Sequence, residues 1–387
     1  MVPNVADPEF WQHGPDAELA ELRRSAPVAR QPEAGFWTIA GHEQIVAISK
    51  DPATYSSARG VLIGDLKRTV TGAESILYVD PPRHVAMRQI VNKGFTVRRV
   101  AQLTPVVEAI VADAFDAIDP TLPIDAVDAI SAPVPILVIA HMLGVPPDDL
   151  PTFRTWSDAI AIAATDPTDP RAMAAIDFFT YFNAKLDART AETDPPDDLL
   201  TAITADAGLT RAEQLGFCMS LLVAGNETTR HLISGGLVAL AEHPEQREVL
   251  AADPSLIPVA VEEMLRWVTP IVAMSRTTTC PVRLDGVDVG ADSYLVMLYA
   301  AANRDETVFG PDAAEFDVTR APNPHLAFGI GEHFCLGAQL ARLEAKIVFT
   351  EVLRRWPHYR VLDGVQTGAS TLLRETVTLP ILLAPNG

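Results

Sequence analysis

A glycine-rich segment, residues 328–337, contains the side chain best suited to bind a metal. It reads Phe-Gly-Ile-Gly-Glu-His-Phe-Cys-Leu-Gly and places Cys335 directly before a helical pattern that starts at Ala338. The glycines allow tight turns and close approach to a flat ligand. A cysteine at a helix start meets free N–H groups and the positive end of the helix dipole, which favour the thiolate. Such a thiolate is a good axial ligand for haem iron, whereas a cysteine beside a glycine turn can also be a buried structural residue.

Two polar groups lie in helical patterns upstream of this segment. Residues 224–229 read Ala-Gly-Asn-Glu-Thr-Thr, and a glycine at 225 costs about 1 kcal/mol relative to alanine in a helix interior, so something should compensate for it. Taken alone, Glu227 would be an ordinary residue on the polar face of the helix. In Glu263-Met264-Leu265-Arg266 the two charges lie three residues apart on one helix face and can bond. An isolated pair of this kind would be a surface contact of small energy.

Most of the chain has helical periodicity, with a minor β region near the C-terminal third. Helices are predicted over 13–24, 42–49, 83–91, 102–118, 134–143 and 210–243; strands are predicted over 36–39, 282–284, 287–289, 293–297 and 376–383. The longest helix begins at a capping box formed by Thr210 and Glu213 and ends at Pro244. Residues 57–79 are expected to form a long loop, and residues 145–175 short broken pieces. Because no linker interrupts the pattern, we expect one domain over residues 1–387.

These motifs, in this order, resemble the cytochrome P450 family. The pattern Phe-x-x-Gly-x-x-x-Cys-x-Gly ending at Gly337 resembles its haem-binding loop, and the Ala-Gly-x-Glu-Thr-Thr run resembles its oxygen-binding helix segment. The likeness extends from about residue 80 to residue 379. It implies the mainly α P450 fold, with the long helix over a haem b that is ligated through Cys335.

The resemblance also implies roles for individual residues. The family has a local helix distortion at 224–229, and Glu227 with Thr228 would relay protons to bound oxygen by general acid catalysis. His84, Arg88, Arg276 and His333 would donate to the haem propionates. Glu263, Arg266 and Arg320 would form a buried structural triad, and His325 would also be structural. The expected haem contacts are His84, Arg88, Ala224, Gly225, Arg276, Phe328, Gly329, His333, Cys335 and Gly337.

The activity implied by the resemblance is that of a monooxygenase, which inserts one oxygen atom from O2 into a hydrophobic small molecule. A sterol, terpenoid, fatty-chain or polyketide-like substrate is expected, with electrons from NAD(P)H through a ferredoxin reductase and a ferredoxin. A ligand-sensing haem protein and a peroxide-driven P450 are the alternatives; the Glu227–Thr228 pair argues against both, because neither requires a proton relay. The expected substrate pocket is apolar and comprises Val61, Leu62, Ile63, Leu221, Ile271, Val272, Ala273, Thr371 and Leu372.

Charge and cysteine content exclude several classes of protein. A net charge of −20 disfavours binding to nucleic acid or anionic membranes. The first residues lack a basic and apolar leader, and the apolar runs are too short to cross a bilayer, so a cytoplasmic protein without a membrane anchor is expected. Three widely spaced cysteines predict neither a disulfide framework nor a zinc site. An acidic ferredoxin would need a local basic face, for which the candidates are Lys93, Arg98, Arg99, Arg342 and Lys346.

Overall fold

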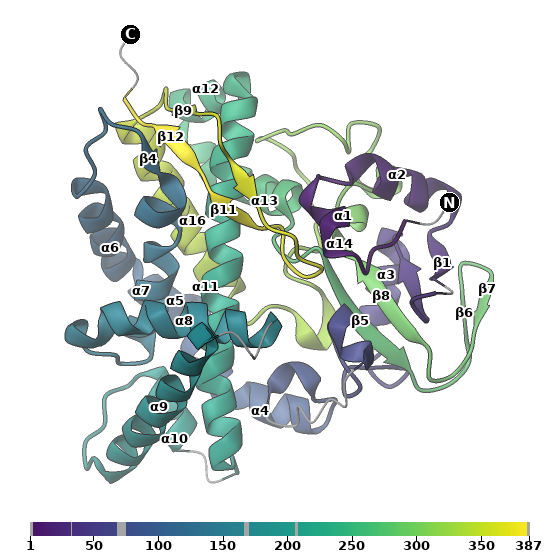
Figure 1. Cartoon of the computed structure of the whole chain (residues 1–387), viewed down its shortest axis with the longest axis horizontal. Coiled ribbons are helices and arrows are strands. Elements are labelled where there is room, and N and C mark those ends of the chain that lie inside the picture. The colour runs from purple at the N-terminus through teal and green to yellow at the C-terminus, as the bar shows by residue number, and fades with distance from the viewer. Residues whose placement is uncertain (1–2, 32, 68–74, 166–169, 206–207, 385–387) are drawn as a thin grey trace.

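A long central helix organises the molecule. The computed structural model describes residues 3–384 except 32, 68–74, 166–169 and 206–207. Figure 1 shows α11 (Arg211–Glu242) running through the structure, with α6 to α10 on one side and the largest sheet on the other. Helix α4 lies below, close to the lower half of α11.

The helices cover most of the described chain. Their bounds are α1 (Pro8–Gln12), α2 (Asp16–Ser25), α3 (His42–Lys50), α4 (Arg83–Asn92), α5 (Val97–Gln102), α6 (Thr104–Asp116), α7 (Pro133–Met142), α8 (Leu150–Thr165), α9 (Ala174–Ala191), α10 (Leu199–Thr204), α11, α12 (Pro244–Ala252), α13 (Ile257–Val268), α14 (Tyr299–Ala302), α15 (Glu306–Phe309) and α16 (Ala338–Arg355). Short 3-10 turns include η1 (Ile63–Lys67), η2 (Ile76–Tyr78), η3 (Lys93–Phe95) and η8 (Gly331–His333).

The strands form one five-stranded sheet and smaller pairings. Their bounds are β1 (Val28–Gln31), β2 (Phe36–Ile39), β3 (Tyr55–Ser56), β4 (Ile124–Asp125), β5 (Ala273–Thr278), β6 (Val282–Leu284), β7 (Val287–Val289), β8 (Tyr294–Leu298), β9 (Arg360–Val361), β10 (Gln366–Thr367), β11 (Thr376–Thr378) and β12 (Pro380–Leu382). The main sheet has the order β1-β2-β8-β5-β3, in which only β2 and β8 are parallel. The other sheets are β4-β12-β9, β6-β7 and β10-β11.

Helix α11 starts as the sequence predicts and is buried along most of its length. The Thr210 hydroxyl accepts from the Glu213 amide, and the Glu213 carboxylate accepts from the Thr210 amide, which completes the capping box. The helix is α-helical from end to end, so the distortion expected at 224–229 is absent.

Three glycines allow neighbouring helices to press closely against α11. A Cβ at 225 would lie 2.7 Å from Ile139 of α7, one at 235 would lie 2.8 Å from Val268 of α13, and one at 236 would lie 2.5 Å from Phe349 of α16. Real Cβ atoms do not approach so closely, so the lost helix propensity of Gly225 is offset by tight helix packing.

The broken segment predicted for 145–175 is wrong, because α8 runs unbroken over Leu150–Thr165. The helix predicted over 102–118 is α6 (Thr104–Asp116), which is two residues shorter at each end. One feature explains where α8 and α6 begin. Pro151 and Pro105 stand in the first turn of their helices, where the amide would have no partner in any case, so each proline marks a start. The loop predicted at 57–79 contains η1 and η2, and its residues 68–74 lie outside the described part of the chain.

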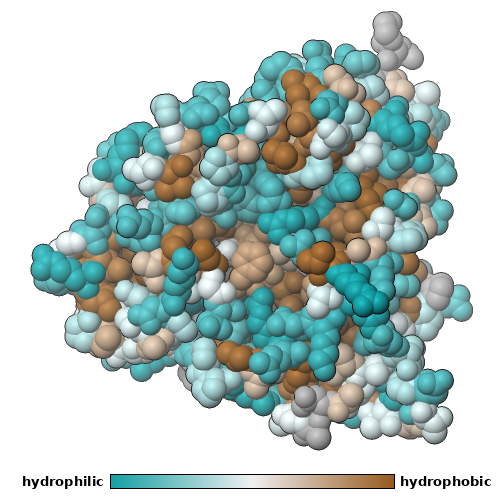
Figure 2. Space-filling model, turned by 180° about the vertical axis from the view of Figure 1, so that it is seen from behind, coloured by the Kyte–Doolittle hydropathy of each residue, from teal (hydrophilic) through white to brown (hydrophobic). Residues whose placement is uncertain are grey.

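The outer surface is mixed in character. On the face turned away from the viewer in Figure 1, hydrophobic residues occur in scattered groups among hydrophilic ones (Figure 2). Among the described helices, none is both long enough and apolar enough to cross a lipid bilayer.

Candidate active site

The segment that carries Cys335 is held against α3 by its backbone. Gly331 has a φ of +80°, and a Cβ there would lie 2.1 Å from the carbonyl oxygen of Ser49, so only glycine fits. The Cys335 amide donates to the Phe328 carbonyl at 2.8 Å, which closes the loop just before α16. The guanidinium of Arg342 lies 4.6 Å from the centre of the Phe328 ring. The loop therefore presents one half-buried sulfur from a constrained backbone.

The surroundings of Cys335 do not by themselves favour its thiolate. Burial raises the pKa of the thiol, and this outweighs the opposite effects of the Gly337 amide and the charges of Arg88 and Arg342. The sequence prediction considered the helix start and omitted burial, which disfavours charge. Coordination of a metal ion removes the proton from a thiol outright.

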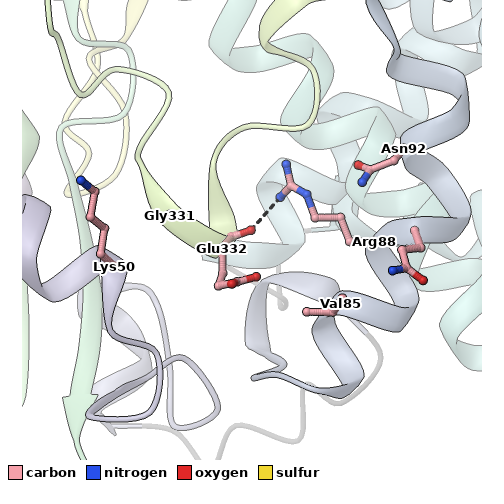
Figure 3. A pocket seen from close by; sticks show the side chains of 7 residues that line it. Lys50, Val85, Arg88, Asn92, Gly331 and Glu332 are labelled. Atoms are coloured by element: carbon pink, nitrogen blue, oxygen red, sulfur yellow. Dashed lines mark hydrogen bonds between the residues drawn. The ribbon is translucent and has the colours of Figure 1, made fainter.

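Four basic side chains gather beside this loop from three elements. His84 and Arg88 come from α4, Arg276 from β5 and His333 from η8. The rings of His84 and His333 have centroids 4.1 Å apart, and His333 Nε2 lies 3.1 Å from the Ser57 hydroxyl. Figure 3 shows Arg88 directed toward the loop, where it donates to the carbonyl of Glu332 at 3.0 Å. The same view shows Lys50, Val85 and Asn92 around a surface hollow of about 400 Å³.

This basic cluster has no carboxylate of the described residues at ion-pair distance, although the charges of Asp80 and Glu332 act on it from further away. In the described part of the chain, none of the four side chains forms an ion pair, and the buried Nδ1 of His84 has no hydrogen-bond partner. Burial lowers the pKa of His84, Arg88 and Arg276. Burial, together with the charge of Arg276, lowers the pKa of His333 to about 2. These donors fit a ligand that brings carboxylates, as the two propionates of haem would.

Ala224 and Thr228 share one face of α11, one turn apart. Ala224 is exposed although it lies in the middle of an otherwise buried helix. The Thr228 hydroxyl donates to the Ala224 carbonyl at 2.7 Å. Gly225 instead lies against Ile139 of α7, so the structure does not place it with the other expected haem contacts.

Glu227 lies beside a set of donors near the same part of α11. Its carboxylate lies 3.5 Å from Arg230 Nη1 and 3.5 Å from His231 Nε2, and Asn226 Nδ2 is 3.4 Å from Oε1. Burial raises the pKa of Glu227, but the contact with His231 and the charge of Arg230 outweigh it, so the pKa is lowered. Glu227 is therefore a carboxylate at neutral pH.

Glu263, Arg266 and Arg320 meet in the interior. Arg266 Nε and Nη2 donate to the two carboxylate oxygens of Glu263 at 2.7 Å each, and Arg320 Nε lies 3.4 Å from Oε1. The remaining Arg266 donors reach the carbonyls of Asn303, Ala313 and Glu315. The cluster thus fastens the segment after α14 to α13.

Segments predicted to line the substrate pocket lie close together, but several of their side chains are buried in the hydrophobic core. The Val272 amide donates to the Leu372 carbonyl at 2.8 Å, and the Ser275 amide donates to the Val61 carbonyl at 2.7 Å. Four of the expected pocket residues are buried: Val61, Leu221, Val272 and Ala273. Val272 and Ala273 belong to the core under the N-terminal helices. The half-buried members are Leu62, Ile63, Ile271, Thr371 and Leu372.

Two of the expected docking charges are already paired. Arg342 makes two hydrogen bonds to Glu262, at 2.7 and 2.8 Å, and Arg99 pairs with Asp197. His325 lies 3.1 Å from the same Glu262 carboxylate. Lys93, Arg98 and Lys346 are exposed on η3, α5 and α16. Only these three remain free of ion pairs with described residues.

Sequence reasoning missed residues that support the site from a distance. Asp80 accepts from the Ser56 hydroxyl and, at 2.8 Å, from the Ser57 amide, which holds Ser57 beside His333. His231 accepts from the Thr376 amide at 3.3 Å. The position of His231 four residues after Glu227 on one helix was the available signal; nothing near Ser57 in the sequence indicated its role.

Comparison with known proteins agrees with this geometry. The family model described as Cytochrome P450 matches residues 255–366. The chain is 33% identical to "Cytochrome P450 130" of Mycobacterium tuberculosis over 96% of this chain and 95% of that protein. It is 34% identical to a "Steroid C26-monooxygenase" of the same species over 93% of this chain and 90% of that protein.

Solved structures give the same result. Cytochrome P450 CYP109Q5 from Chondromyces apiculatus superimposes with a TM-score of 0.88 at 36% identity, covering 100% of both chains. CYP109E1 from Bacillus megaterium in complex with corticosterone superimposes with a TM-score of 0.86 at 32% identity, covering 96% of this chain and 98% of that one. The chain belongs to the cytochrome P450 family, has its fold and is a monooxygenase of that family, which implies a haem cofactor.

Proposed function

We propose that this chain is a haem-thiolate monooxygenase in which Cys335 is the protein ligand of the iron, acting on a hydrophobic molecule of about steroid size. The observation that carries the proposal is the buried and half-buried cluster of His84, Arg88, Arg276 and His333, which lies beside Cys335 without an ion-pair partner among the described residues. A group with two carboxylates and an iron that takes a thiolate would satisfy both features at once.

The roles of the protein residues follow from their contacts. When bound, the haem supplies the activation of O2 for insertion of one oxygen atom into a C–H bond. Arg276 and His333 would hold one edge of the group by charge-assisted hydrogen bonds, and His84 with Arg88 would do the same from α4. The positive φ angles of Gly329 and Gly331 and the close approach of Gly331 to Ser49 would fix the course of the loop that carries Cys335.

Proton handling falls to Thr228 and Glu227. The hydroxyl proton of Thr228 is used in its bond to Ala224, so the oxygen offers its lone pairs first and donates only when that bond opens. Glu227 is ionised and can therefore accept a proton from the solvent side and pass it toward Thr228. This relay favours an O2-using enzyme over the sensor and the peroxide-driven alternatives.

The proposed substrate class rests on the expected pocket residues that are apolar and not fully buried in the core. Ile63, Ile271 and Leu372 are half-buried and come from three segments that lie together. A relative named for steroid oxidation and a fold neighbour solved with corticosterone support a steroid-like guest. Adding steroids, terpenoids and fatty acids in turn should show which class shifts the haem Soret band. A panel in which only fatty acids shift the band would contradict the steroid assignment.

Electrons would come from NAD(P)H through a reductase and an acidic ferredoxin that docks near Lys93, Arg98 and Lys346. Their exposure on neighbouring elements in a chain of net charge −20 supports this surface. Arg98→Glu should slow the first electron transfer severalfold at low salt, because opposite charges steer association. Arg360→Glu, on the exposed strand β9, is the matched control. Stopped-flow rates that respond to neither salt nor Arg98→Glu would exclude this docking surface.

The identity of the iron ligand is tested by exchanging each cysteine. Ferrous protein with carbon monoxide should show the red-shifted Soret band of thiolate ligation, and Cys335→Ala should lose it completely. Cys218→Ala and Cys280→Ala should keep it, since Cys218 is buried in α11 and Cys280 is exposed beyond β5. Retention of the band in Cys335→Ala would refute the assignment.

A further inference from the structure

His231 is held by a backbone contact that fixes its tautomer. The residue lies on α11 and is only 2% exposed. Its Nδ1 lies 3.3 Å from the backbone nitrogen of Thr376, the first residue of β11. Because a backbone amide can only donate, Nδ1 must carry the lone pair, and the proton of the neutral ring is on Nε2.

This Nε2 proton faces the carboxylate of Glu227. Nε2 is buried and has no hydrogen-bond partner within normal distance, while Oε2 of Glu227 lies 3.5 Å away. A buried donor without an acceptor is unfavourable, so a small rotation of the carboxylate toward the ring is favoured. The two residues are four apart on one helix, a spacing that places side chains side by side.

The other contacts of Glu227 are less fixed than this one. Arg230 Nη1 lies 3.5 Å from both carboxylate oxygens, but its side chain is 19% exposed and long. Asn226 Nδ2 lies 3.4 Å from Oε1 and makes a shorter hydrogen bond, 2.9 Å, to the Ser157 hydroxyl of α8. Of the three, His231 alone has a hydrogen bond to the backbone of another element among the described residues.

We propose that His231 is a positioning residue that holds the Glu227 carboxylate through Nε2–H and thereby sets how efficiently protons reach the oxygen site. His231 keeps its own proton and transfers none; Glu227 accepts and passes on the proton that comes from solvent. This inference rests on the relay proposed for Glu227 and Thr228. Its consequence is a larger share of reducing equivalents in product and a smaller share in hydrogen peroxide.

Two substitutions at His231 test the two ring nitrogens separately. His231→Gln places an amide N–H where Nε2 was and keeps a donor for Glu227. His231→Asn leaves an acceptor where Nδ1 was, so it keeps the contact with Thr376 and loses the donor. We expect His231→Asn to lower product per NAD(P)H about tenfold with unchanged substrate affinity, because misplaced catalytic groups lose rate steeply. His231→Gln should recover most of the coupling.

A purely structural role, such as anchoring β11, would reverse this order, because only Asn preserves that anchor. His13→Asn, which changes an exposed histidine, should leave coupling unchanged. The carbon monoxide band confirms that each variant is loaded with haem. Equal coupling of His231→Asn and the natural protein would overturn the inference.

The variant Glu227→Gln distinguishes the two proposals. If it uncouples the enzyme while His231→Asn does not, the inference about His231 fails and the relay stands. If Glu227→Gln leaves coupling intact, the relay itself fails, and with it the role of His231.

A second measurement needs no turnover. Protein labelled with [15N]histidine, in the diamagnetic ferrous carbon monoxide state, should show the His231 signal with its proton on Nε2. The difference between the natural protein and His231→Gln assigns that signal. A proton on Nδ1 would exclude donation to Glu227 and overturn the inference.

Discussion

Two clusters of titratable side chains, the Glu263–Arg266–Arg320 triad and the basic cluster beside Cys335, differ in their pairing. In the triad, Glu263 receives Arg266 and Arg320 and also accepts from the Asp317 amide at 2.9 Å and from Asn323 at 3.0 Å. Beside Cys335, four basic side chains meet without a carboxylate among the described residues at ion-pair distance. The first group has its counter-charge within the chain, whereas the second makes no ion pair with the described residues.

This difference in pairing distinguishes a cluster that stabilises the fold from a cluster that is suited to bind a ligand. A buried charge is tolerated when its partner and its hydrogen bonds are present, and it is strongly unfavourable when one partner is removed. The triad should therefore contribute to folding with or without haem. The basic cluster should cost folding energy in the haem-free protein and contribute only once carboxylates arrive.

The largest effect is expected from breaking the triad. Glu263→Ala removes the carboxylate that pairs with the buried Arg266 and leaves Arg320 only its pair with the exposed Asp312, so it should destabilise the protein by about 3–5 kcal/mol. The matched control is Glu351→Ala, whose pairs with Arg354 and Arg355 are at the surface and should contribute under about 1 kcal/mol. Urea unfolding of the haem-free proteins measures both. Similar losses for the two variants would show that burial does not distinguish them.

A smaller effect is expected from breaking the basic cluster. Arg276→Met removes charge-assisted hydrogen bonds to the ligand, which are worth roughly 1.5–3 kcal/mol, so haem affinity should fall by about 10- to 100-fold. The haem-free protein should be as stable as before or more so, because Arg276 is a buried cation that makes no ion pair with a described residue. Haem titration tests the expected loss of affinity, and thermal melting of the haem-free protein tests the expected stability. A marked loss of stability without haem would place Arg276 in the same class as the triad.

The smallest effect concerns Glu262, which lies between these two cases. Burial raises its pKa, but Arg342 and His325 outweigh this and lower the pKa to about 2. Since this is below the unfolded value, the stabilisation is complete above about pH 4.5 and is lost as the pH falls toward 2. Because the side chain is 28% exposed, we expect about 1–3 kcal/mol at pH 7. Glu262→Gln should show this deficit at pH 7 and lose it as the pH falls from about 4.5 to 2.

Local sequence patterns predicted helices and strands, but they could not predict features that depend on contacts between distant parts of the chain. The Thr210 capping box and the strands around Gly286 depend on neighbours in the chain, and both predictions are confirmed. The pairing of Arg342 with Glu262 joins residues from α16 and α13, so the chain order gave no indication that this charge is neutralised. Val272 was expected in a pocket because it is apolar, but apolar character does not tell which side of a strand meets the core.

The glycines of α11 also determine which parts of the molecule can move. Ile139, Val268 and Phe349 contact the helix where Gly225, Gly235 and Gly236 leave no side chain between them. Sliding or rotating α11 would drive these side chains into its backbone, so the helix serves as a fixed frame for α7, α13 and α16. Widening of the site for a bulky guest therefore has to come from elements other than α7, α13 and α16.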